Sequence, residues 1–324
     1  MMNSRLAALT LAAALVGAVA ETADATEGGL FYGPVGGSDI RAALVGQPGA
    51  LYGFGIGVSS DSSKFARNVG EPNEVIEGWG LTSQFLGGGL AYVWPTQVLG
   101  GSVMSTVASL YGRTCVEMYD IKDCNRGMYE TYTDLFYWSR HVGLAGATPG
   151  PEGSTPYPLQ YGLTVALGMA VVFPTGKYDS DRLANIGGNT LIYVPNVAFT
   201  YQTGPWWLDG TELSGRIFYN IPTENDATKY QNGHVIAGDF ALSQRYDRWQ
   251  FGPLLTVAQQ LTNDKIDGRV VGKGNKLEQR AAGFVVNYDI PDKGMAITAK
   301  YLHDFKNENR LYIDTFIVRV GFTF

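Results

Sequence analysis

Residues 161–173, YGLTVALGMAVVF, alternate between two kinds of side chain. The odd positions carry Tyr, Leu, Val, Met and Phe, and the even positions carry mainly Gly, Ala and Thr. Successive residues of a β-strand point to opposite faces, so this segment predicts a strand with one large apolar face and one small face. A soluble sandwich would place charged residues on its outer face. The pattern is therefore typical of a strand in the wall of a membrane β-barrel.

The carboxyl-terminal segment repeats this alternation up to the last residue. One face carries Phe316, Val318, Val320, Phe322 and Phe324, and the other carries Thr315, Ile317, Arg319, Gly321 and Thr323. A terminal aromatic residue on such a strand resembles the recognition signal of bacterial outer-membrane barrels. The resemblance implies that the barrel assembly machinery is a partner, recognising the chain through Phe324.

Twelve segments of this kind recur along the chain. Each reaches about the 9 to 11 residues that a tilted strand needs to cross a bilayer. They are 51–60, 80–94, 98–112, 131–144, 159–173, 189–202, 206–221, 233–246, 249–261, 277–288, 295–305 and 311–324. We therefore predict an all-β fold, a transmembrane antiparallel β-barrel of about twelve strands. An even number of strands places both ends of the barrel domain on one side.

The connections alternate in length, as expected when short turns lie on the periplasmic side and long loops lie outside. The predicted periplasmic turns are 95–97, 203–205, 247–248 and 289–294, and the predicted outer loops are 61–79, 113–130, 174–188, 222–232, 262–276 and 306–310. Residues 145–158 break the pattern, because they are long yet fall on the periplasmic side. Aromatic residues gather near the short turns and indicate a girdle at the headgroup level: Tyr92, Trp94, Trp206, Trp207, Tyr246, Trp249 and Tyr288.

The amino terminus has the order of an export signal. Arg5 precedes an apolar run over 6–18 and the small residues Ala18-Val19-Ala20, which predicts a signal peptide over 1–20, with cleavage at 25 as an alternative. An amino-terminal segment over 21–50 then precedes the barrel at 51–324. Residues 38–46 resemble a short helix with a capping Ser38 and a terminating Gly46. This segment could fill the lumen as a plug or lie in the periplasm.

Composition excludes some functions. The net charge of -6 argues against a nucleic-acid partner. The only two cysteines, Cys115 and Cys124, predict a disulfide in an oxidising compartment rather than a metal site, because neither has a zinc-like partner at the required spacing. The sequence contains no motif for a cofactor or a metal.

Polar residues mark the candidate lumen face. A Lys or Arg on the lipid face would cost about 2–4 kcal/mol, so the charges within the strands should point inward, away from the surrounding outer-membrane lipid. Two roles are open for them: pairing across the lumen, or selecting solutes. The candidates are Arg216, Asn220, Asp239, Arg245, Gln260, Lys300, Asp304 and Arg319.

Catalysis has little support in the sequence. The nearest arrangement to a catalytic pair is Ser139-Arg140-His141, whose first and third residues share one strand face. No orienting third group is visible. We therefore predict that the protein is not an enzyme, and keep a barrel-embedded acyl hydrolase only as the last alternative.

Several stretches carry a family resemblance: 173–179 (FPTGKYD), 182–189 (RLANIGGN), 198–201 (AFTY), 225–233 (NDATKYQNG) and 259–264 (QQLTND). They are similar to the family named for the MetA pathway of phenol degradation, a group of outer-membrane transporters. The resemblance implies uptake of hydrophobic or aromatic molecules across the outer membrane of a Gram-negative cell. The loop motif is Pro174, Thr175, Gly176, Tyr178, Asp179, Asn185, Gly187 and Asn189, in which turn chemistry favours a hairpin cap over a direct substrate contact.

Two main functions follow from the sequence. The first is an outer-membrane channel or transporter for a small-molecule solute of hydrophobic or aromatic character. The alternative is a non-conducting barrel with a binding or structural role, whose activity would lie in the outer loops.

Overall fold

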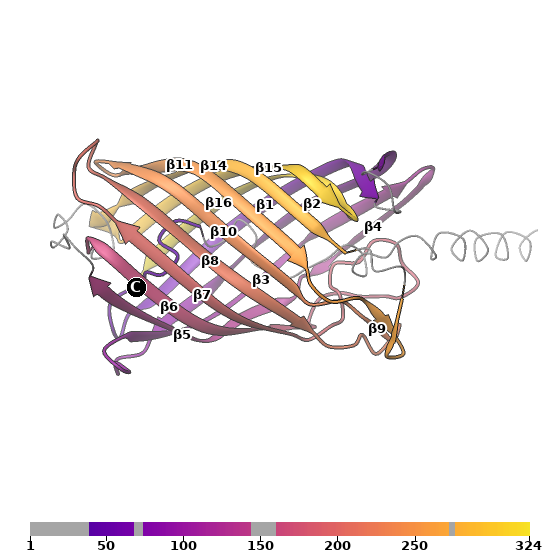
Figure 1. The fold of residues 1–324 in the computed structure, drawn as a ribbon, viewed down its shortest axis with the longest axis horizontal. Coiled ribbons are helices and arrows are strands. Elements are labelled where there is room, and N and C mark those ends of the chain that lie inside the picture. The colour runs from indigo at the N-terminus through magenta and orange to yellow at the C-terminus, as the bar shows by residue number, and fades with distance from the viewer. Residues whose placement is uncertain (1–38, 68–73, 144–159, 272–275) are drawn as a thin grey trace, which may run out of the picture.

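The computed structural model describes residues 39–67, 74–143, 160–271 and 276–324. The predicted signal peptide, the first part of the amino-terminal segment and loop 145–158 lie outside the described residues. Twelve long antiparallel strands form a closed barrel, as predicted (Figure 1). They are β1 (Leu51–Arg67), β2 (Glu74–Val93), β3 (Ser102–Met118), β5 (Thr131–Gly143), β6 (Gly162–Phe173), β7 (Ile192–Gln202), β8 (Gly210–Pro222), β10 (Val235–Tyr246), β11 (Trp249–Gln260), β14 (Glu278–Ile290), β15 (Met295–Glu308) and β16 (Arg310–Thr323).

Closure is made by the first and last strands. β1 pairs with β2 on one side and with β16 on the other, while β3 continues the wall to β5. Each residue of the ladder therefore has a neighbouring strand, which removes the exposed sheet edge that a bilayer does not tolerate. A short 3-10 helix (Pro291–Lys293) turns the chain from β14 into β15.

Connections differ at the two ends of the barrel. Figure 1 shows the carboxyl terminus at the left end with the short turns, called here the short-turn end. The opposite, long-loop end carries β4 (Ile121–Met128) and a small sheet of β9 (Tyr230–Gln231), β12 (Lys265–Ile266) and β13 (Arg269–Val270). Among the described residues, no helix has the length and apolar character of a membrane span.

Four expected strand and loop bounds need correction. Residues 61–79 are not one long loop, because β1 runs to Arg67 and β2 begins at Glu74. Residues 113–130 are not an open loop: β3 extends and pairs with β4 as a hairpin, in which the disulfide-linked Cys115 and Cys124 lie opposite each other. β3 begins at Ser102 rather than at 98, because Val98 and Gly101 close a tight turn. β8 begins at Gly210 rather than at 206, because residues 203–209 turn and bend before the ladder starts.

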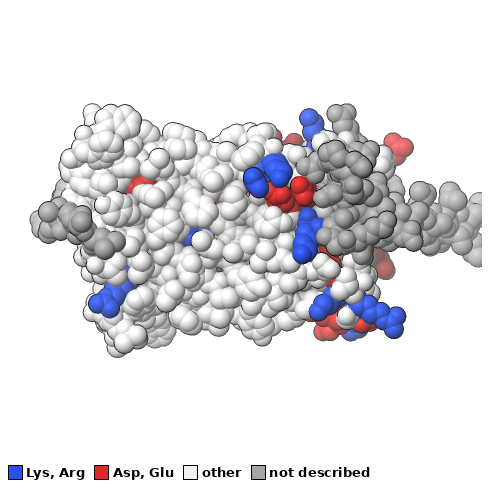
Figure 2. Space-filling view, in the orientation of Figure 1, with Lys and Arg blue, Asp and Glu red and all other residues white. Residues whose placement is uncertain are grey.

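The outer surface of the barrel is apolar. On β6 the odd positions face outward, with Leu167 51% exposed, and on β2 the side chain of Leu86 is 72% exposed. Figure 2 shows the side of the barrel almost free of charged residues, which gather at the long-loop end. This distribution matches a wall in contact with lipid and a polar end in water.

The inner face of β5 to β8 is closely packed. The even positions of β6 are buried, and a Cβ added at Gly168 would lie 2.7 Å from both the Asn196 Oδ1 and the Tyr137 Cδ2. The small residues of the 161–173 segment therefore make room for larger side chains of the neighbouring strands inside the barrel.

Candidate functional site in the barrel lumen

Residues 39–46 of the amino-terminal segment lie inside the lumen. Residues 40–43 form a turn and not the predicted helix, and Arg41 has a positive φ of 55°. Three backbone N–H groups donate to the wall instead of to an earlier turn of helix: Arg41 to Glu212 Oε1 (2.6 Å), Ala42 to Ser214 Oγ (2.9 Å) and Ala43 to Thr200 Oγ1 (3.0 Å). Wall side chains thus replace the hydrogen bonds that a helix would have made.

The carbonyl groups of the segment are also paired with the wall. The hydroxyl of Tyr137 donates to the Ala42 carbonyl (2.6 Å), and the hydroxyl of Ser139 donates to the Ala43 carbonyl. Buried backbone groups are costly when unpaired, so a wall that supplies five partners accommodates this segment in one position.

Two ion pairs hold the first part of the turn, through Asp39 and Arg41. Lys300 Nζ lies 2.7 and 2.6 Å from the two Asp39 carboxylate oxygens, and the Arg41 guanidinium makes two bonds of 3.0 and 2.6 Å to Asp289. Asp39, Lys300 and Asp289 are buried. Breaking a buried pair leaves an uncompensated charge and costs about 3–5 kcal/mol.

Apolar contacts complete the packing of the segment. Ile40 clusters with Ala241, Leu254, Val285 and Leu302, and Ala43 clusters with Tyr137, Ala166 and Ala198. The segment therefore touches strands on both sides of the lumen.

Seven of the eight lumen candidates are buried, and Arg319 is half-buried. Lys300 binds the segment, while Asp239 accepts a hydrogen bond from Thr256 (2.8 Å). The remaining candidates bond to nearby residues: Arg245 to the Thr203 carbonyl (3.1 Å), Asn220 to the Val235 carbonyl (3.3 Å), Gln260 to Asp264 (2.8 Å), and Asp304 to Gln279 (2.7 Å) and Asn307 (2.8 Å). The structure distributes them over the lumen and does not gather them into one cluster.

Arg216 is surrounded more completely. Its guanidinium donates to Asp134 (2.6 Å) and Asn196 (3.0 Å) and lies over the rings of Tyr137 (4.3 Å to the centroid) and Phe218 (4.9 Å). Stacking and ion pairing together hold a planar cation inside the barrel. Because Tyr137 also binds the Ala42 carbonyl, Arg216 is linked through this ring to the amino-terminal segment.

One wall of the lumen is apolar, which sequence reasoning missed. Residues opposite each other in an antiparallel pair share a face. Ile56 lies opposite Arg319, which shares its strand face with the buried Ile317, and Phe85 lies opposite Val58. The lumen face of β1, β2 and β3 thus carries a set that we call the apolar wall: Phe54, Ile56, Val58, Phe85 and Leu110.

On β1 the rule that large residues face lipid is inverted. Gly53, Gly55 and Gly57 point outward, and the large residues between them point into the lumen. A Cβ on Gly53 would lie 2.5 Å from the outward-facing ring of Phe322, so this aromatic side chain of β16 covers Gly53. The side chains of the apolar wall are half-buried, unlike the buried inner face of β6.

The loop motif is organised by a residue that the sequence did not single out. Glu130, just before β5, accepts hydrogen bonds from the N–H groups of Gly176 (2.9 Å) and Gly188 (2.7 Å). Burial raises the pKa of this carboxyl group, and the backbone N–H groups oppose the rise. A Cβ on Gly187 would lie 2.6 Å from Glu130 Oε1, which explains why the motif has glycine there.

Other motif residues also hold the loop to its surroundings. The side chain of Asn185 accepts a hydrogen bond from the Asp179 N–H (2.9 Å) and donates one to the Asp179 carbonyl (3.0 Å). Asn189 has a φ of 51°, and its side chain donates to Asn225 (2.8 Å). Thr175 bonds to Thr131 (2.8 Å). Pro174 is exposed and Tyr178 is half-buried.

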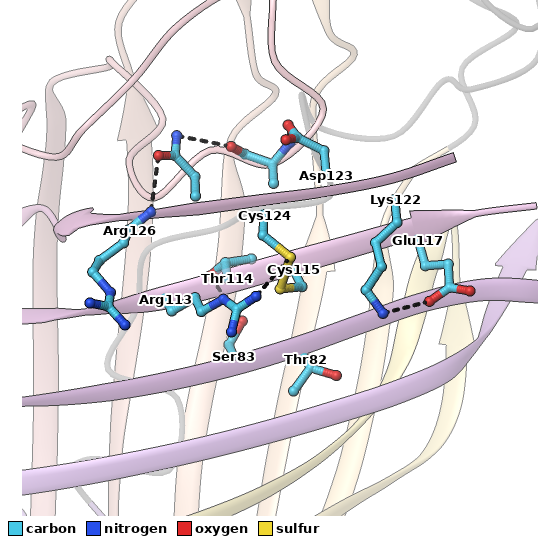
Figure 3. Close-up of a disulfide and its surroundings, with 12 residues drawn as sticks. Thr82, Ser83, Arg113, Thr114, Cys115, Glu117, Lys122, Asp123, Cys124 and Arg126 are labelled. Atoms are coloured by element: carbon cyan, nitrogen blue, oxygen red, sulfur yellow. Dashed lines mark hydrogen bonds and ion pairs between the residues drawn. A yellow bond between two sulfur atoms is a disulfide. The ribbon is translucent and has the colours of Figure 1, made fainter. Parts of the chain in front are cut away.

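The β3–β4 hairpin clamps the same loop from outside. Asp123 pairs with Arg182 and accepts the Ala184 N–H (2.9 Å), while Asn125 donates to the Ala184 carbonyl (3.1 Å). Figure 3 shows Asp123 next to the disulfide residue Cys124 on β4. The disulfide and this clamp therefore act on one structural unit.

Further loops join this unit. Asn225 donates to the Gly188 carbonyl (3.4 Å), and Asp264 accepts hydrogen bonds from Tyr230 (2.5 Å) and from the Gly233 N–H (2.6 Å). We call residues 121–130, 174–191, 223–234 and 261–271 the loop collar. Three stretches that carried the family resemblance, 182–189, 225–233 and 259–264, thus meet at the long-loop end.

The Ser139/His141 pair is not formed. Ser139 donates to the Ala43 carbonyl, and His141 Nδ1 bonds to Thr164 (3.1 Å). Within the described part of the chain, no group of three or more His, Cys, Asp or Glu side chains is placed to hold a metal ion.

A closed twelve-stranded barrel with an apolar outer band and a polar long-loop end defines an integral β-barrel of the Gram-negative outer membrane. The model of the family described as "Putative MetA-pathway of phenol degradation" matches residues 66–320, and the chain belongs to this family. No curated protein sequence matches the chain.

One of the solved structures that resemble this chain shows the same fold. An outer membrane channel from Pseudomonas putida F1 is similar with a TM-score of 0.73 at 14% identity, covering 88% of this chain and 99% of that chain. The transport unit of the autotransporter AIDA-I from Escherichia coli has a TM-score of 0.46 at 11% identity, covering 88% and 93% of the two chains. At such identities only the first likeness bears on the fold, and neither bears on the solute.

Proposed function

We propose that this protein is an outer-membrane channel for small hydrophobic or aromatic molecules, and that residues 39–46 plug its lumen. The observation that carries the proposal is the apolar wall. Phe54, Ile56, Val58, Phe85 and Leu110 face the inside of a membrane barrel and are only half-buried. The lumen of a water-filled porin is polar, whereas an apolar lining favours solutes that gain from leaving water.

The described family and the fold of the Pseudomonas putida channel support the same function. The family description points to phenol-type compounds, which combine a ring with a polar group. A lumen with an apolar wall on β1 to β3 and charged groups such as Lys300 and Arg319 on β15 and β16 suits this combination. The long-loop end would face outward, so a solute would pass the loop collar before it meets residues 39–46.

A non-conducting barrel is the second candidate. It is favoured by the dense hydrogen bonding of the lumen candidates and of the amino-terminal segment. Such a barrel would keep residues 39–46 in place permanently. The two candidates differ in whether any path opens.

Planar-bilayer recording of the purified full chain separates them. The channel should conduct, and phenol should reduce the current in a concentration-dependent way by occupying the apolar wall. Phe85→Asn should weaken this block, whereas Leu86→Ala, which alters the next residue on the lipid side, should leave it unchanged. Absence of current under all conditions would favour the non-conducting barrel. If phenol reduces the current of Phe85→Asn as strongly as that of the unaltered protein, the apolar wall does not line the path of the solute.

A further inference from the structure

Asp39 and Ile40 occupy a site built by the inner faces of β10, β11, β14 and β15. Lys300 holds both oxygens of the Asp39 carboxylate at 2.7 and 2.6 Å, and all three charged atoms are shielded from water. Asp239 and Arg319 act electrostatically on Lys300 from the neighbouring wall. This is the geometry of a charge-assisted carboxylate site.

The apolar part of the site lies directly beside the ammonium group. Val285 is opposite Lys300 in the β14–β15 pairing, and Leu302 is the next inward-facing residue of β15. Ala241 and Leu254 lie opposite each other on β10 and β11, and these four side chains surround Ile40. One carboxylate and one apolar body of a few carbon atoms therefore fill the site side by side.

We propose that Asp39 and Ile40 stand in for a small amphipathic monocarboxylate, of about the size of benzoate, which binds this site when the segment leaves it. The inference rests on the proposed function in one respect: the solute reaches the site through the lumen. The carboxylate would bond to Lys300 Nζ, and the ring or alkyl body would replace Ile40.

The charge of Lys300 selects the class of ligand. If the segment leaves, Lys300 loses its two hydrogen bonds to the Asp39 carboxylate, and loss of one member of a buried ion pair is strongly unfavourable. An incoming carboxylate restores the pair, whereas a neutral ring fills only the apolar part. Solute binding and departure of the segment are therefore coupled through one ammonium group.

Competition by the segment predicts weak binding to the unmodified protein. A tethered group competes at an effective concentration that is roughly millimolar for a short linker. Weakening the tethered carboxylate should therefore tighten the binding of the free one.

Binding is measured by titrating benzoate into the purified full chain in detergent, with isothermal calorimetry as the readout. Asp39→Asn should tighten benzoate binding by about 10-fold, and Lys300→Met should weaken it by about 10-fold, the usual effect of one charge-assisted pair. Leu255→Ala, which alters the lipid-facing neighbour of Leu254 on β11, is the matched control and should leave benzoate affinity unchanged. Benzyl alcohol should bind more weakly than benzoate, and Lys300→Met should not weaken its binding, because a neutral ring fills only the apolar part of the site. The shift of gel mobility on boiling checks that each variant is a folded barrel.

Three results would overturn the proposal: benzoate affinity unchanged in both variants, loss of affinity in Asp39→Asn, or preferential binding of benzylammonium. Conductance without any Lys300-dependent binding of benzoate would refute this site but not the proposed channel function. Lys300-dependent binding without any conductance would refute the channel and keep the site in a binding barrel.

Discussion

Departure of residues 39–46 from the lumen can be measured by thiol labelling. Ala43 is fully buried against Tyr137, Ala166 and Ala198. The two native cysteines form a disulfide, so Ala43→Cys introduces the single free thiol. A maleimide can react with this thiol only when the segment opens, and the labelling rate then reports the open population.

The structure sets the expected change in rate. Tyr137→Phe removes the one hydroxyl that donates to the Ala42 carbonyl, a loss of about 1 kcal/mol or roughly a 5-fold higher open population. Asp289→Asn breaks the two-bond pair with Arg41. Loss of a buried ion pair costs about 3 kcal/mol or more, which corresponds to an increase upwards of about 100-fold.

Ala170→Cys provides the control. Ala170 is equally buried inside the barrel but packs with Val172, Ile192, Val194 and Phe218, away from the segment. Its labelling should stay slow in both variants. The reasoning is refuted if Ala43→Cys reacts in the otherwise unaltered protein as fast as Leu99→Cys, which is 82% exposed, or if neither substitution changes its rate.

Three further predictions concern the loop collar and the faces of the wall. Glu130→Ala removes the acceptor of the Gly176 and Gly188 N–H groups, and each buried N–H group left without an acceptor costs about 1–3 kcal/mol of stability. Limited proteolysis should then cut within 174–191. An uncut loop would contradict the role of this carboxylate. The pKa of Asp123 is held below its ordinary value of 3.8 by the Ala184 N–H and then by Arg182. A lowered folded-state pKa contributes stability above pH 3.8 that is lost as the pH falls through the folded value. The protection factors of the amides in 182–188, taken relative to the intrinsic exchange rate at each pH, should therefore fall on acidification, and Asp123→Asn should show no such dependence. Leu86→Lys should lower the free energy of unfolding in vesicles by about 2–4 kcal/mol, because residue 86 faces lipid. Ile56→Lys should lower it less, because residue 56 faces the lumen. A larger loss for Ile56→Lys than for Leu86→Lys in urea titrations would contradict the assignment of the two faces.

The strands were predictable because one physical rule acts along the whole chain. Alternation in 161–173 and 311–324 reflects lipid on one side and the lumen on the other. The ten other predicted segments also coincide with strands within a few residues, although β1 carries its large side chains on the lumen face. The hairpin in residues 113–130 was not predicted because β4 lies outside the barrel wall, where this rule does not apply. β4 pairs with the extension of β3 at the long-loop end, and its pairing is set by the Cys115–Cys124 disulfide and by the contacts with Ala184.

The interior was less predictable because its contacts are remote in sequence. Ser38 and Gly46 favoured a helix locally, but Thr200, Glu212 and Ser214 offer acceptors more than 150 residues away and keep residues 40–43 in a turn. Glu130 gave no signal, since its partners are backbone groups of 176 and 188. The inward position of Phe54, Ile56 and Val58 requires the register against β16, which alternation alone does not supply.

Uptake by intact Gram-negative cells tests the central claim most directly. Cells that express the protein should accumulate a labelled aromatic solute of the phenol type faster than cells without it, and Phe85→Asn should reduce this gain while Leu86→Ala preserves it. A polar solute of similar size should show a smaller gain. Equal uptake with and without the protein, at matched amounts of folded barrel in the outer membrane, would contradict a channel for aromatic molecules.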